Sequence, residues 1–420
     1  MNNPKLRFRD DSGSRFVDWQ KVSFGKTFSF LKSSAFSRAQ LNYRGGQIKN
    51  VHYGDILVKF PTILNSCCND VPYVNPAEKT EKYDLLQVGD IVIADTAEDL
   101  TVGKAIEISD VSNNIIAGLH TIACRPQRKF ANRFLGYYLN SKAFHNQLVP
   151  LATGIKVYSI IKSEIVKTRI NVPCLEEQQK IANFFSTLDE KIELSERKLE
   201  ALEQLKKGLM QKIFNQKIRF KRSDGSMYKN WERTRISRLF NFIRNGFVGT
   251  IAPHYTDKNN GIRYLQGTNI HNGRISDNIE YYVTKEFNQA HSKNILKHDD
   301  ILMVQSGHVG ECAVVGNYAG SNCHALIIMS NAGMCSSDYI RFYFESSIGK
   351  RQLALISVGN TVKHILASDV SKLSVLIPEI EEQEKIANLF LSIEKRIDIV
   401  EKQLESLKQL KKGFMQQMFV

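Results

Sequence analysis

The residues best suited to catalysis in this chain stand in patterns that stop short of a complete active site. Gly25-Lys26-Thr27 resembles the end of a phosphate-binding loop, but Gln20 stands where that loop requires its first glycine. Asp189-Glu190-Lys191 has nuclease-like spacing, yet it lies in a predicted helix whose surface charge accounts for it. The chain has no Asp/Asn-Pro-Pro-Tyr/Phe tetrad of amino-methyltransferases, and none of its nine prolines precedes an aspartate. We therefore expect a protein without catalytic residues of its own.

The cysteines and histidines do not form a metal-binding pattern. None of the seven cysteines belongs to a Cys-x-x-Cys pair, and the Cys323-His324 doublet has no second pair of ligands nearby. We expect no metal site, no bound cofactor, and thiols that are reduced and mostly buried. The cysteines are Cys67, Cys68, Cys124, Cys174, Cys312, Cys323 and Cys335.

The charge balance favours an anionic partner. Lysine and arginine outnumber aspartate and glutamate by 57 to 43, which gives a formal net charge of +14 and a pI near 9.3. Nucleic acid is the first candidate and an anionic membrane the second, although a basic protein without such a partner has the same composition. The first ten residues are polar, and no apolar run approaches the roughly 18 residues that span a bilayer. We expect a cytoplasmic protein with no membrane contact.

Side chains that could read or hold DNA are plentiful outside the predicted helices. Base edges are read by paired hydrogen-bonding groups, and phosphates are held by lysine, arginine and backbone amides. Each candidate has the alternative of being an ordinary solvated loop residue. In the first half of the chain they are Lys32, Ser34, Arg38, Tyr43, Arg44, Lys156 and Tyr158. In the second half they are Asn245, Phe247, Thr250, His254, Tyr255, Thr268, Asn269, Gln305, Ser306, His308, Thr361, Lys363 and His364.

The segments that must position these residues occur twice. The stretch from Pro173 to Gln211 recurs without a gap from Pro378 to Gln416, with about half of the positions identical. Each half also opens alike, because Leu6-Arg7-Phe8 and Trp19 are matched at the same spacing by Ile218-Arg219-Phe220 and Trp231. The order is therefore variable region, repeat, variable region, repeat.

Each repeat predicts one long helix. Glutamates follow the opening proline, lysines stand near the end, and apolar residues recur at spacings of three and four, as in a coiled-coil seam. A single apolar stripe must be buried, and the simplest partner is the second copy, running antiparallel if a pseudo-two-fold relates the halves. Self-association of the chain, or capping of each domain, would bury the stripe too. The predicted seam residues are Phe185, Leu188, Ile192, Leu199, Leu202, Phe390, Ile393, Ile397, Leu404 and Leu407.

The variable regions predict mixed α/β domains. Short β-type runs occur at 55–60, 90–94 and 300–304, and short helices are expected around 133–148 and 338–355. The basic run that begins with Lys217, Arg219, Lys221 and Arg222 is either a solvated linker that complements the helix dipole or a phosphate-contacting surface. The predicted fold class is α+β, with segments at 1–171, 172–216, 217–376 and 377–420.

The motif Pro-x-Ile/Leu-x-Glu-Gln-x-Lys-Ile-Ala-x-x-Phe, at Pro173 and again at Pro378, resembles the repeated regions of type I restriction-modification specificity subunits. The run 359–365 and the two openings are similar to that family as well, although 154–158 lacks the threonine of the second copy. The resemblance implies two target recognition domains that read a bipartite DNA sequence, separated by antiparallel helices that set the unread spacer. It also implies two methyltransferase and two restriction subunits as partners, which would carry S-adenosylmethionine, ATP and Mg.

Two other functions stay open at this stage. A coiled-coil scaffold that binds DNA without defined sequence specificity would share the helices and the charge. A single-chain methyltransferase or nuclease would need motifs that the chain lacks.

Overall fold

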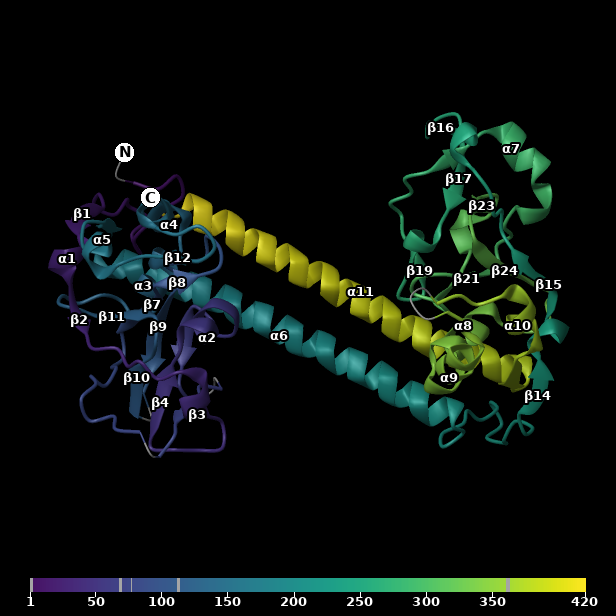
Figure 1. Cartoon of the computed structure of the whole chain (residues 1–420), viewed down its shortest axis with the longest axis horizontal. Helices are drawn as coiled ribbons and strands as arrows, with labels where there is room; N and C mark the ends of the chain where they lie inside the picture. Colours follow the sequence, from purple (N-terminus) through teal and green to yellow (C-terminus); the bar gives the residue numbers. More distant parts are fainter. Residues whose placement is uncertain (1–2, 68–69, 77, 112–113, 360–362) are drawn as a thin grey trace. The chain divides into compact units, whose positions relative to one another are not determined.

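The computed structural model describes residues 3–67, 70–76, 78–111, 114–359 and 363–420 (Figure 1). The chain forms two compact units. Unit 1 comprises Met1–Arg197 and Lys402–Val420, and unit 2 comprises Lys198–Glu401. Two long helices run through both units: α6 is Leu175–Phe214 and α11 is Ile380–Gln417. Each unit therefore takes part of each predicted helical segment together with one variable region.

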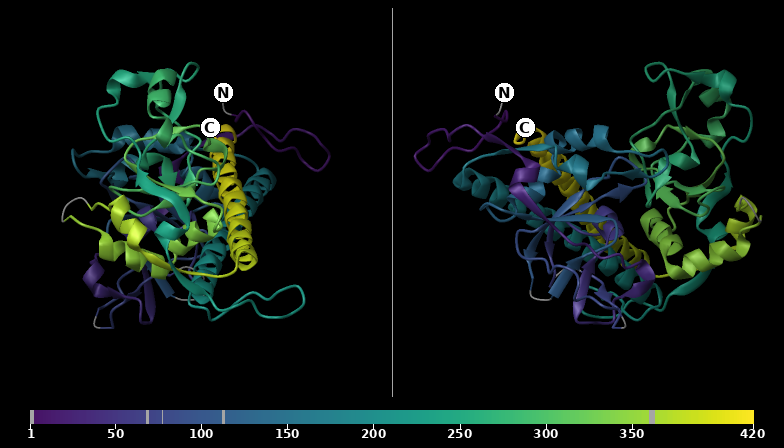
Figure 2. Two further views of the ribbon diagram at one scale, coloured as in Figure 1. Left: turned by 90° about the vertical axis from the view of Figure 1, so that its right-hand side faces the viewer. Right: turned by 60° about the vertical axis from the view of Figure 1, so that its left-hand side comes forward.

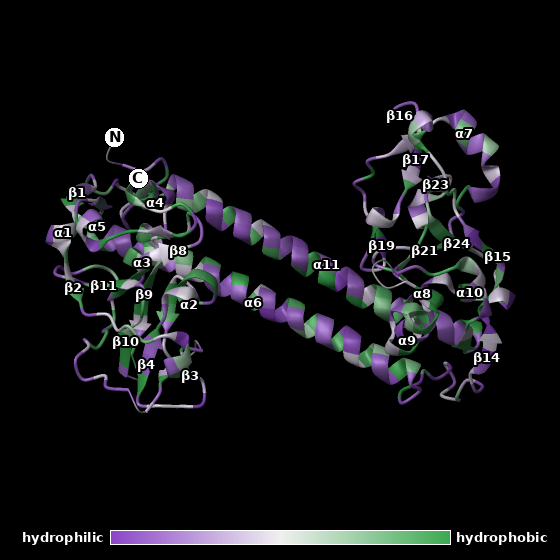
Figure 3. Ribbon diagram, viewed as in Figure 1, coloured by the Kyte–Doolittle hydropathy of each residue, from purple (hydrophilic) through white to green (hydrophobic). Residues whose placement is uncertain are grey.

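The two long helices form where the repeats predict them. Glutamates occupy the first turn of each, and neither helix contains proline, so nothing interrupts about 60 Å of helix in α6. In Figure 3 apolar and polar residues alternate along both helices. Within unit 1, Lys411 bonds Asp189 at 2.5 Å and Lys408 bonds Glu196 at 2.7 Å. The residue numbers of the contacting pairs increase along α6 while they decrease along α11, which confirms that the two helices are antiparallel.

The predicted seam residues all face inward to some degree. Phe185 and Phe390 are fully buried, and Leu188 and Ile393 nearly so. In unit 1 Phe185 stacks on Phe419 with ring centroids 5.6 Å apart. Seam residues nearer the middle of the helices are only half-buried: Ile192, Leu199, Leu202, Ile397, Leu404 and Leu407. Among these predicted seam residues, burial is therefore highest where a helix end meets its domain, and Val400 near the middle of α11 is buried as well.

A duplicated clamp fixes each variable region to its helix. In unit 1 the Glu177 carboxylate is fully buried and accepts hydrogen bonds from the Arg7 guanidinium at 2.7 and 2.9 Å and from Trp19 Nε1 at 3.1 Å. The hydrogen bond to Glu177 raises the pKa of Arg7. In unit 2 Glu382 is buried in the same way, and the corresponding arginine and tryptophan bond it at 2.7 to 3.2 Å. The repeated glutamate and the repeated domain openings are thus two parts of one contact.

The neighbouring glutamine is also duplicated in its contacts. Gln178 donates to the Pro173 carbonyl at 2.8 Å and accepts from the Ala131 amide at 2.9 Å. Gln383 donates to the Pro378 carbonyl at 2.9 Å and accepts from the Ser336 amide at 2.9 Å. A buried amide that fills its polar sites in this way specifies one orientation of the helix start on its domain.

The described residues of unit 1 form two larger sheets and two strand pairs. The five-stranded sheet has the order β2-β11-β7-β9-β5, and the four-stranded sheet has the order β10-β4-β6-β3. The strands are β1 (Gln20–Ser23), β2 (Phe28–Leu31), β3 (Leu41–Asn42), β4 (Ile48–Val51), β5 (Ile63–Asn65), β6 (Tyr73–Val74), β7 (Ile91–Ala94), β8 (Thr96–Ala97), β9 (Ala105–Asp110), β10 (Asn114–Ala117), β11 (Thr121–Pro126), β12 (Tyr158–Ser159) and β13 (Arg169–Val172). The pairs β1-β13 and β8-β12 are antiparallel.

Unit 2 repeats this layout with local differences. One sheet has the order β15-β24-β21-β22 and the other β16-β20-β17-β23, and the antiparallel pair β14-β25 matches β1-β13. The strands are β14 (Glu232–Arg235), β15 (Phe240–Asn245), β16 (Tyr255–Thr256), β17 (Ile262–Leu265), β18 (Ile270–His271), β19 (Arg274–Ile275), β20 (Tyr282–Val283), β21 (Ile301–Val304), β22 (Cys312–Val314), β23 (Asn322–Cys323), β24 (Leu326–Asn331) and β25 (Ser374–Ile377). Both units are mixed α/β, as predicted.

Short helices cover these sheets. The predicted helical stretches each form two helices, because Ser141 and Ser346 cap the second helix of each pair with their side chains. The helices are α1 (Phe24–Thr27), α2 (Tyr53–Val58), α3 (Phe134–Leu139), α4 (Lys142–Leu148), α5 (Lys162–Ile165), α7 (Lys285–Ala290), α8 (Ser337–Glu345), α9 (Ser347–Ile356) and α10 (Ala367–Lys372).

One predicted strand is wrong. Residues 55–60 do not form a strand, because most of this stretch lies in helix α2. His52 caps that helix by accepting from the Gly54 amide at 3.2 Å, and the side chain of Ile56 enters the core while Val58 is 87% exposed. The apolar run is therefore buried on one helical face only. The strands predicted at 90–94 and 300–304 are confirmed as β7 and β21.

Both chain termini belong to unit 1. The Leu6 amide donates to the Gln417 carbonyl at 3.1 Å, and the two ends lie near each other in Figures 1 and 2. Across the described ranges, no helix is both long and apolar enough to cross a bilayer.

Candidate nucleic-acid interface

Two loops predicted to contact DNA lie side by side in unit 2. The β21–β22 turn carries Gln305, Ser306 and His308, and a second loop is closed by reciprocal backbone bonds of 2.8 and 2.9 Å between Val358 and His364. Ser306 bridges to His364, and the Ile365 amide donates to the Gln305 carbonyl at 3.0 Å. We call these two loops the paired loops of unit 2. His308, Lys363 and His364 are exposed there, so the pairing gathers predicted residues from both loops on one edge.

Thr361, which was predicted to contact DNA from the second of these loops, lies outside the described residues. Its role therefore stays a prediction.

Unit 1 builds the same backbone arrangement from a different sequence. Ser159 and Thr153 exchange bonds of 2.8 and 3.0 Å, and the Ile160 amide donates to the Asp95 carbonyl at 2.8 Å. Lys156 is exposed on this loop, and Tyr158 is half-buried in β12, where it pairs with Ala97. The missing threonine therefore does not change how the loop closes.

A groove of about 490 Å³ lies in unit 1 beside the contact between Asp95 and the loop that Thr153 and Ser159 close. His120 approaches Asp95 at 3.5 Å in this groove, and Lys162 lies 4.1 Å from the centre of the Phe30 ring. His120 and Lys162 were not among the predicted residues. No local motif marks either residue, because their partners Asp95 and Phe30 are distant in sequence.

Buried polar atoms without partners accompany the paired loops of unit 2. Among the described residues, Asn245 Oδ1 and Gln305 Oε1 are buried and make no hydrogen bond. A buried polar atom of this kind costs free energy unless a ligand or water satisfies it. Amides of asparagine and glutamine are also the groups that pair with adenine edges. Base reading by these two residues stays a prediction.

An aromatic cluster forms the other part of unit 2. Phe247 and His254 both pack on Phe287, with ring centroids 5.2 and 4.8 Å away. Tyr255 stacks on Tyr281 at 4.9 Å, and its hydroxyl accepts from Gln266 at 3.2 Å. Phe247 is thus mainly a packing residue, whereas His254 is exposed at the rim of the cluster.

Two further candidates, Thr250 and Thr268, are exposed on the loops around this cluster. Either hydroxyl is free to approach a partner from solvent.

A basic and aromatic cluster lies in unit 1. Arg38 holds Asp55 with two bonds of 2.8 and 2.9 Å, and this interaction raises the pKa of Arg38. Lys59 lies 4.4 Å from the centre of the Tyr43 ring. Arg44, which follows Tyr43 in the sequence, is exposed. Lys59, the residue that follows α2, was not among the predicted residues, and it also pairs with Asp70 at 2.8 Å.

Two predicted DNA-contacting residues are buried and serve the fold instead. Ser34 is 4% exposed and its hydroxyl accepts from the Asn50 amide at 2.8 Å. Asn269 is 6% exposed and accepts from the Gln266 backbone amide at 2.8 Å. Neither side chain is available to a partner. Lys32, by contrast, is exposed.

Two arginines of the basic run after α6 are neutralised. Arg219 belongs to the clamp on Glu382, and Arg222 bonds Glu379. These contacts favour a structural role over a phosphate-contacting one for both arginines. Lys217 and Lys221 are exposed.

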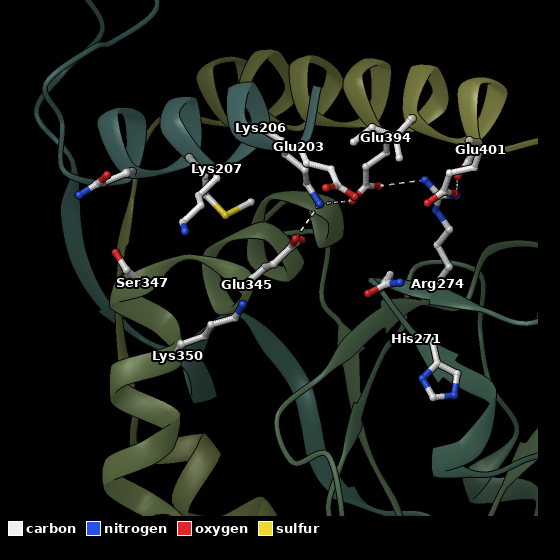
Figure 4. Close-up of a pocket in the computed structure, with 15 residues that line it drawn as sticks. Glu203, Lys206, Lys207, His271, Arg274, Glu345, Ser347, Lys350, Glu394 and Glu401 are labelled. Atoms are coloured by element: carbon white, nitrogen blue, oxygen red, sulfur yellow. Dashed lines mark hydrogen bonds and ion pairs between the residues drawn. The ribbon is translucent and has the colours of Figure 1, made fainter. Parts of the chain in front are cut away.

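A charged pocket of about 800 Å³ lies within unit 2 (Figure 4). Lys206 bonds both Glu345 and Glu394, at 2.6 and 2.8 Å, and Arg274 bonds Asp398. Arg341 holds Glu394 with two bonds of 3.1 and 2.9 Å. Because the carboxylates of Glu345, Glu394 and Asp398 are each paired with a cation here, we interpret these contacts as a structural joint between the helices and their domain.

Most of the described cysteines are buried, as the sequence predicts. Cys124, Cys312, Cys323 and Cys335 are buried, and burial raises the pKa of Cys335 to about 12. Cys67 is exposed and donates to Asp110 at 3.2 Å. Cys68 lies outside the described residues.

Sequence comparison finds one family twice in this chain. Residues 18–204 and again 228–409 match the type I restriction modification DNA specificity domain. The MjaX type I restriction enzyme specificity subunit of Methanocaldococcus jannaschii is 26% identical over 349 residues, which cover 80% of this chain and 79% of that protein. The EcoKI specificity subunit of Escherichia coli K12 is 21% identical over 298 residues, or 67% of this chain and 62% of that one.

A solved structure shares the fold. The S subunit of a type I restriction-modification system from M. genitalium superposes with a TM-score of 0.63 at 14% identity, and the match covers 100% of this chain and 99% of that one. At this identity the likeness concerns the fold alone.

Proposed function

Because this chain belongs to the family of type I restriction-modification DNA specificity proteins, we propose that each unit reads one half of a bipartite DNA sequence. The observation that carries the proposal is the duplicated clamp. Glu177 and Glu382 hold two domains of different sequence on two helices of similar sequence, with the same contacts. A frame that is repeated while its loops differ suits two readers of different half-sites.

The paired loops supply the reading surface in this proposal. In unit 2, Lys363 and His364 are exposed on the loop that pairs with Gln305 and Ser306. The amide oxygens of Gln305 and Asn245 are buried without a hydrogen-bond partner, and we propose that both amides turn toward the bases when DNA binds. In unit 1, Lys156 with His120 and Lys162 take the corresponding place. Arg44 is suited to phosphate contact, because it is an exposed cation next to Tyr43. Lys59 is less suited, because its charge is paired with Asp70 at 2.8 Å.

Catalysis is assigned to partner subunits. We expect two methyltransferase subunits and two restriction subunits to assemble with this chain on double-stranded DNA in the cytoplasm. S-adenosylmethionine, ATP and Mg would bind to those partners. The antiparallel helices would set the unread spacer between the half-sites and provide the docking frame. A DNA-binding scaffold without sequence specificity is less well supported, because it gives no reason for two different loop sets on one frame.

Methylome sequencing tests the proposal directly. A host that carries the chain with its partner genes should show adenine methylation at one two-part motif, and the motif should disappear on deletion of this chain. Replacing residues 1–150 with the equivalent region of another family member should change one half-site and leave the other unchanged. A methylome that does not respond to either change would refute the proposal.

A further inference from the structure

We propose that His271, His308 and Glu311 form a binding site for a divalent transition-metal ion in unit 2. His271 ends strand β18, and the other two residues lie in the β21–β22 turn. One ligand atom from each residue lies within 4.8 Å of the other two. Residues distant in sequence thus place two imidazoles and a carboxylate around one point.

The distances between the three side chains leave room for an ion, because Glu311 forms no hydrogen bond with either histidine ring. Glu311 Oε2 lies 3.6 Å from His308 Nε2 and 4.0 Å from His271 Nδ1, too far for hydrogen bonds to either ring. The imidazole rings stack with centroids 5.1 Å apart. Within the described part of the chain, this carboxylate oxygen is buried without a hydrogen-bond partner. A cation between the three groups would satisfy the oxygen.

The turn that carries two of the ligands is held by its backbone. The Val304 amide donates to the Glu311 carbonyl at 2.8 Å, and the Gly310 amide donates to the Val304 carbonyl at 2.9 Å. Gly310 has a φ of +88°, which favours glycine at this position. The turn therefore presents His308 and Glu311 from a defined backbone.

The His308 ring has a second neighbour besides Glu311. Its Nε2 lies 3.1 Å from the Ile270 carbonyl, which directs this edge of the ring toward β18 and His271. Imidazole binds metals in its neutral form through a nitrogen that carries no proton. An ion bound at Nε2 therefore requires the tautomer that carries its proton on Nδ1, and it replaces the hydrogen bond between Nε2 and the Ile270 carbonyl.

The ligand set selects the class of ion. Imidazole nitrogen suits Zn²⁺, Co²⁺, Ni²⁺ and Cu²⁺, whereas Mg²⁺ and Ca²⁺ prefer oxygen alone. Two histidines and one glutamate match open zinc sites, in which water completes the coordination. Ligands about 2.0–2.2 Å from a tetrahedral ion lie about 3.3–3.6 Å apart, so the side chains must close by about 1 Å. The His271 and Glu311 side chains are 60% and 38% exposed and have room to do so.

The consequence for reading DNA rests on the proposed function. A bound ion would tie the β21–β22 turn, with Gln305 and Ser306, to the strand that follows Thr268. His308 would then hold this turn in place instead of contacting a base. No local motif signals such a site, because its first ligand is separated from the others by several strands and turns.

A calorimetric titration of the isolated full chain with zinc, in the absence of DNA, measures the affinity of the site. This test does not depend on the proposed function. We expect one Zn²⁺ per chain, and loss of at least about 100-fold in affinity in His271→Ala, His308→Ala and Glu311→Gln, beyond the 10–100-fold typical of outer-shell changes. His298→Ala is the matched control, because His298 is a 70% exposed histidine of the same unit and should bind zinc as the parent chain does.

Cobalt gives a second readout of the same site. Co²⁺ bound by the parent chain and by the His298→Ala control should give the visible absorption of a four-coordinate complex, and the three ligand variants should not. Circular dichroism of the variants confirms that they fold. No saturable zinc binding, or binding that the ligand variants retain, would overturn the proposal.

Discussion

The charged pocket of unit 2 makes a quantitative prediction about Glu394→Gln. The Glu394 side chain is 7% exposed and shares its charge with Arg341, which is 3% exposed, and with Lys206. Burial alone would raise the pKa of Glu394, but these two cations outweigh it and the pKa is lowered. Removing the negative charge takes away the most buried partner of both cations, and leaves Lys206 with Glu345 at 2.6 Å and Arg341 with Asp338 at 3.4 Å, both of them more exposed carboxylates. Breaking a buried pair by removing one partner costs about 3–5 kcal/mol.

The duplicated frame supplies the matched control. Asp189 occupies the equivalent place in unit 1, where it bonds Lys411 at 2.5 Å and accepts from the Tyr137 hydroxyl at 2.8 Å. Its side chain is 35% exposed and faces one cation rather than two. Solvent screening therefore limits the cost of Asp189→Asn to about 1 kcal/mol or less.

The assay uses one tryptophan per unit. Trp231 is the only tryptophan of unit 2 and Trp19 the only one of unit 1, so urea unfolding in a Trp19→Phe background reports on unit 2 alone. With a slope of about 3 kcal/mol/M, Glu394→Gln should lower the midpoint by about 1–1.7 M. Asp189→Asn, followed through Trp19 in a Trp231→Phe background, should lower it by about 0.3 M or less. Equal shifts for the two substitutions would refute the argument from burial.

Three further predictions follow from other parts of the chain. Glu107 is buried, and burial raises its pKa to about 7 against the bonds it accepts from the Gly136 and Arg133 amides. Its folded state therefore holds a proton that the unfolded state releases, so stability should fall by roughly 3 kcal/mol as the pH rises from about 4.5 to 7. Glu107→Gln should flatten that dependence in thermal melts, and an unchanged pH profile would contradict it. Lys363→Ala should reduce the salt slope of DNA binding by about one, whereas Lys372→Ala, whose charge is paired with Asp369, should leave it unchanged. Inserting seven residues in both long helices adds about 10 Å, which should widen the unread spacer by about three base pairs in the methylome; an unchanged spacer would exclude the ruler role.

The long helices were predictable because the same pattern occurs in two copies, and each copy tests the interpretation of the other. The same apolar spacing appears at Phe185 and at Phe390, so the two copies together exclude chance agreement. The strand predicted at 55–60 failed because a short apolar run fits a strand and a half-buried helix equally well. What decided between them is the cap at His52 and the pairing of Asp55 with Arg38, and neither contact can be read from local sequence.

The candidate site was harder to predict than the frame for a physical reason. The side chains of Ser34 and Asn269 could form hydrogen bonds with DNA, but both are buried and already bonded within the fold. Residues such as Lys59 and His120 were not predicted, because only the folded structure brings them into contact with Tyr43 and Asp95. Residue type therefore predicts what a side chain can do, and only the tertiary contacts show whether it is free to do so.

The two copies of the frame show which contacts the fold depends on and which are free to vary. Glu177 and Glu382 keep the same partners although the domains around them differ. The loops close with the same backbone bonds at Thr153 and at Val358, although their side chains do not correspond. A backbone-closed loop on a fixed clamp can change its side chains without moving its position. Specificity can then change by substitution in the loops, while the helices that hold them stay constant.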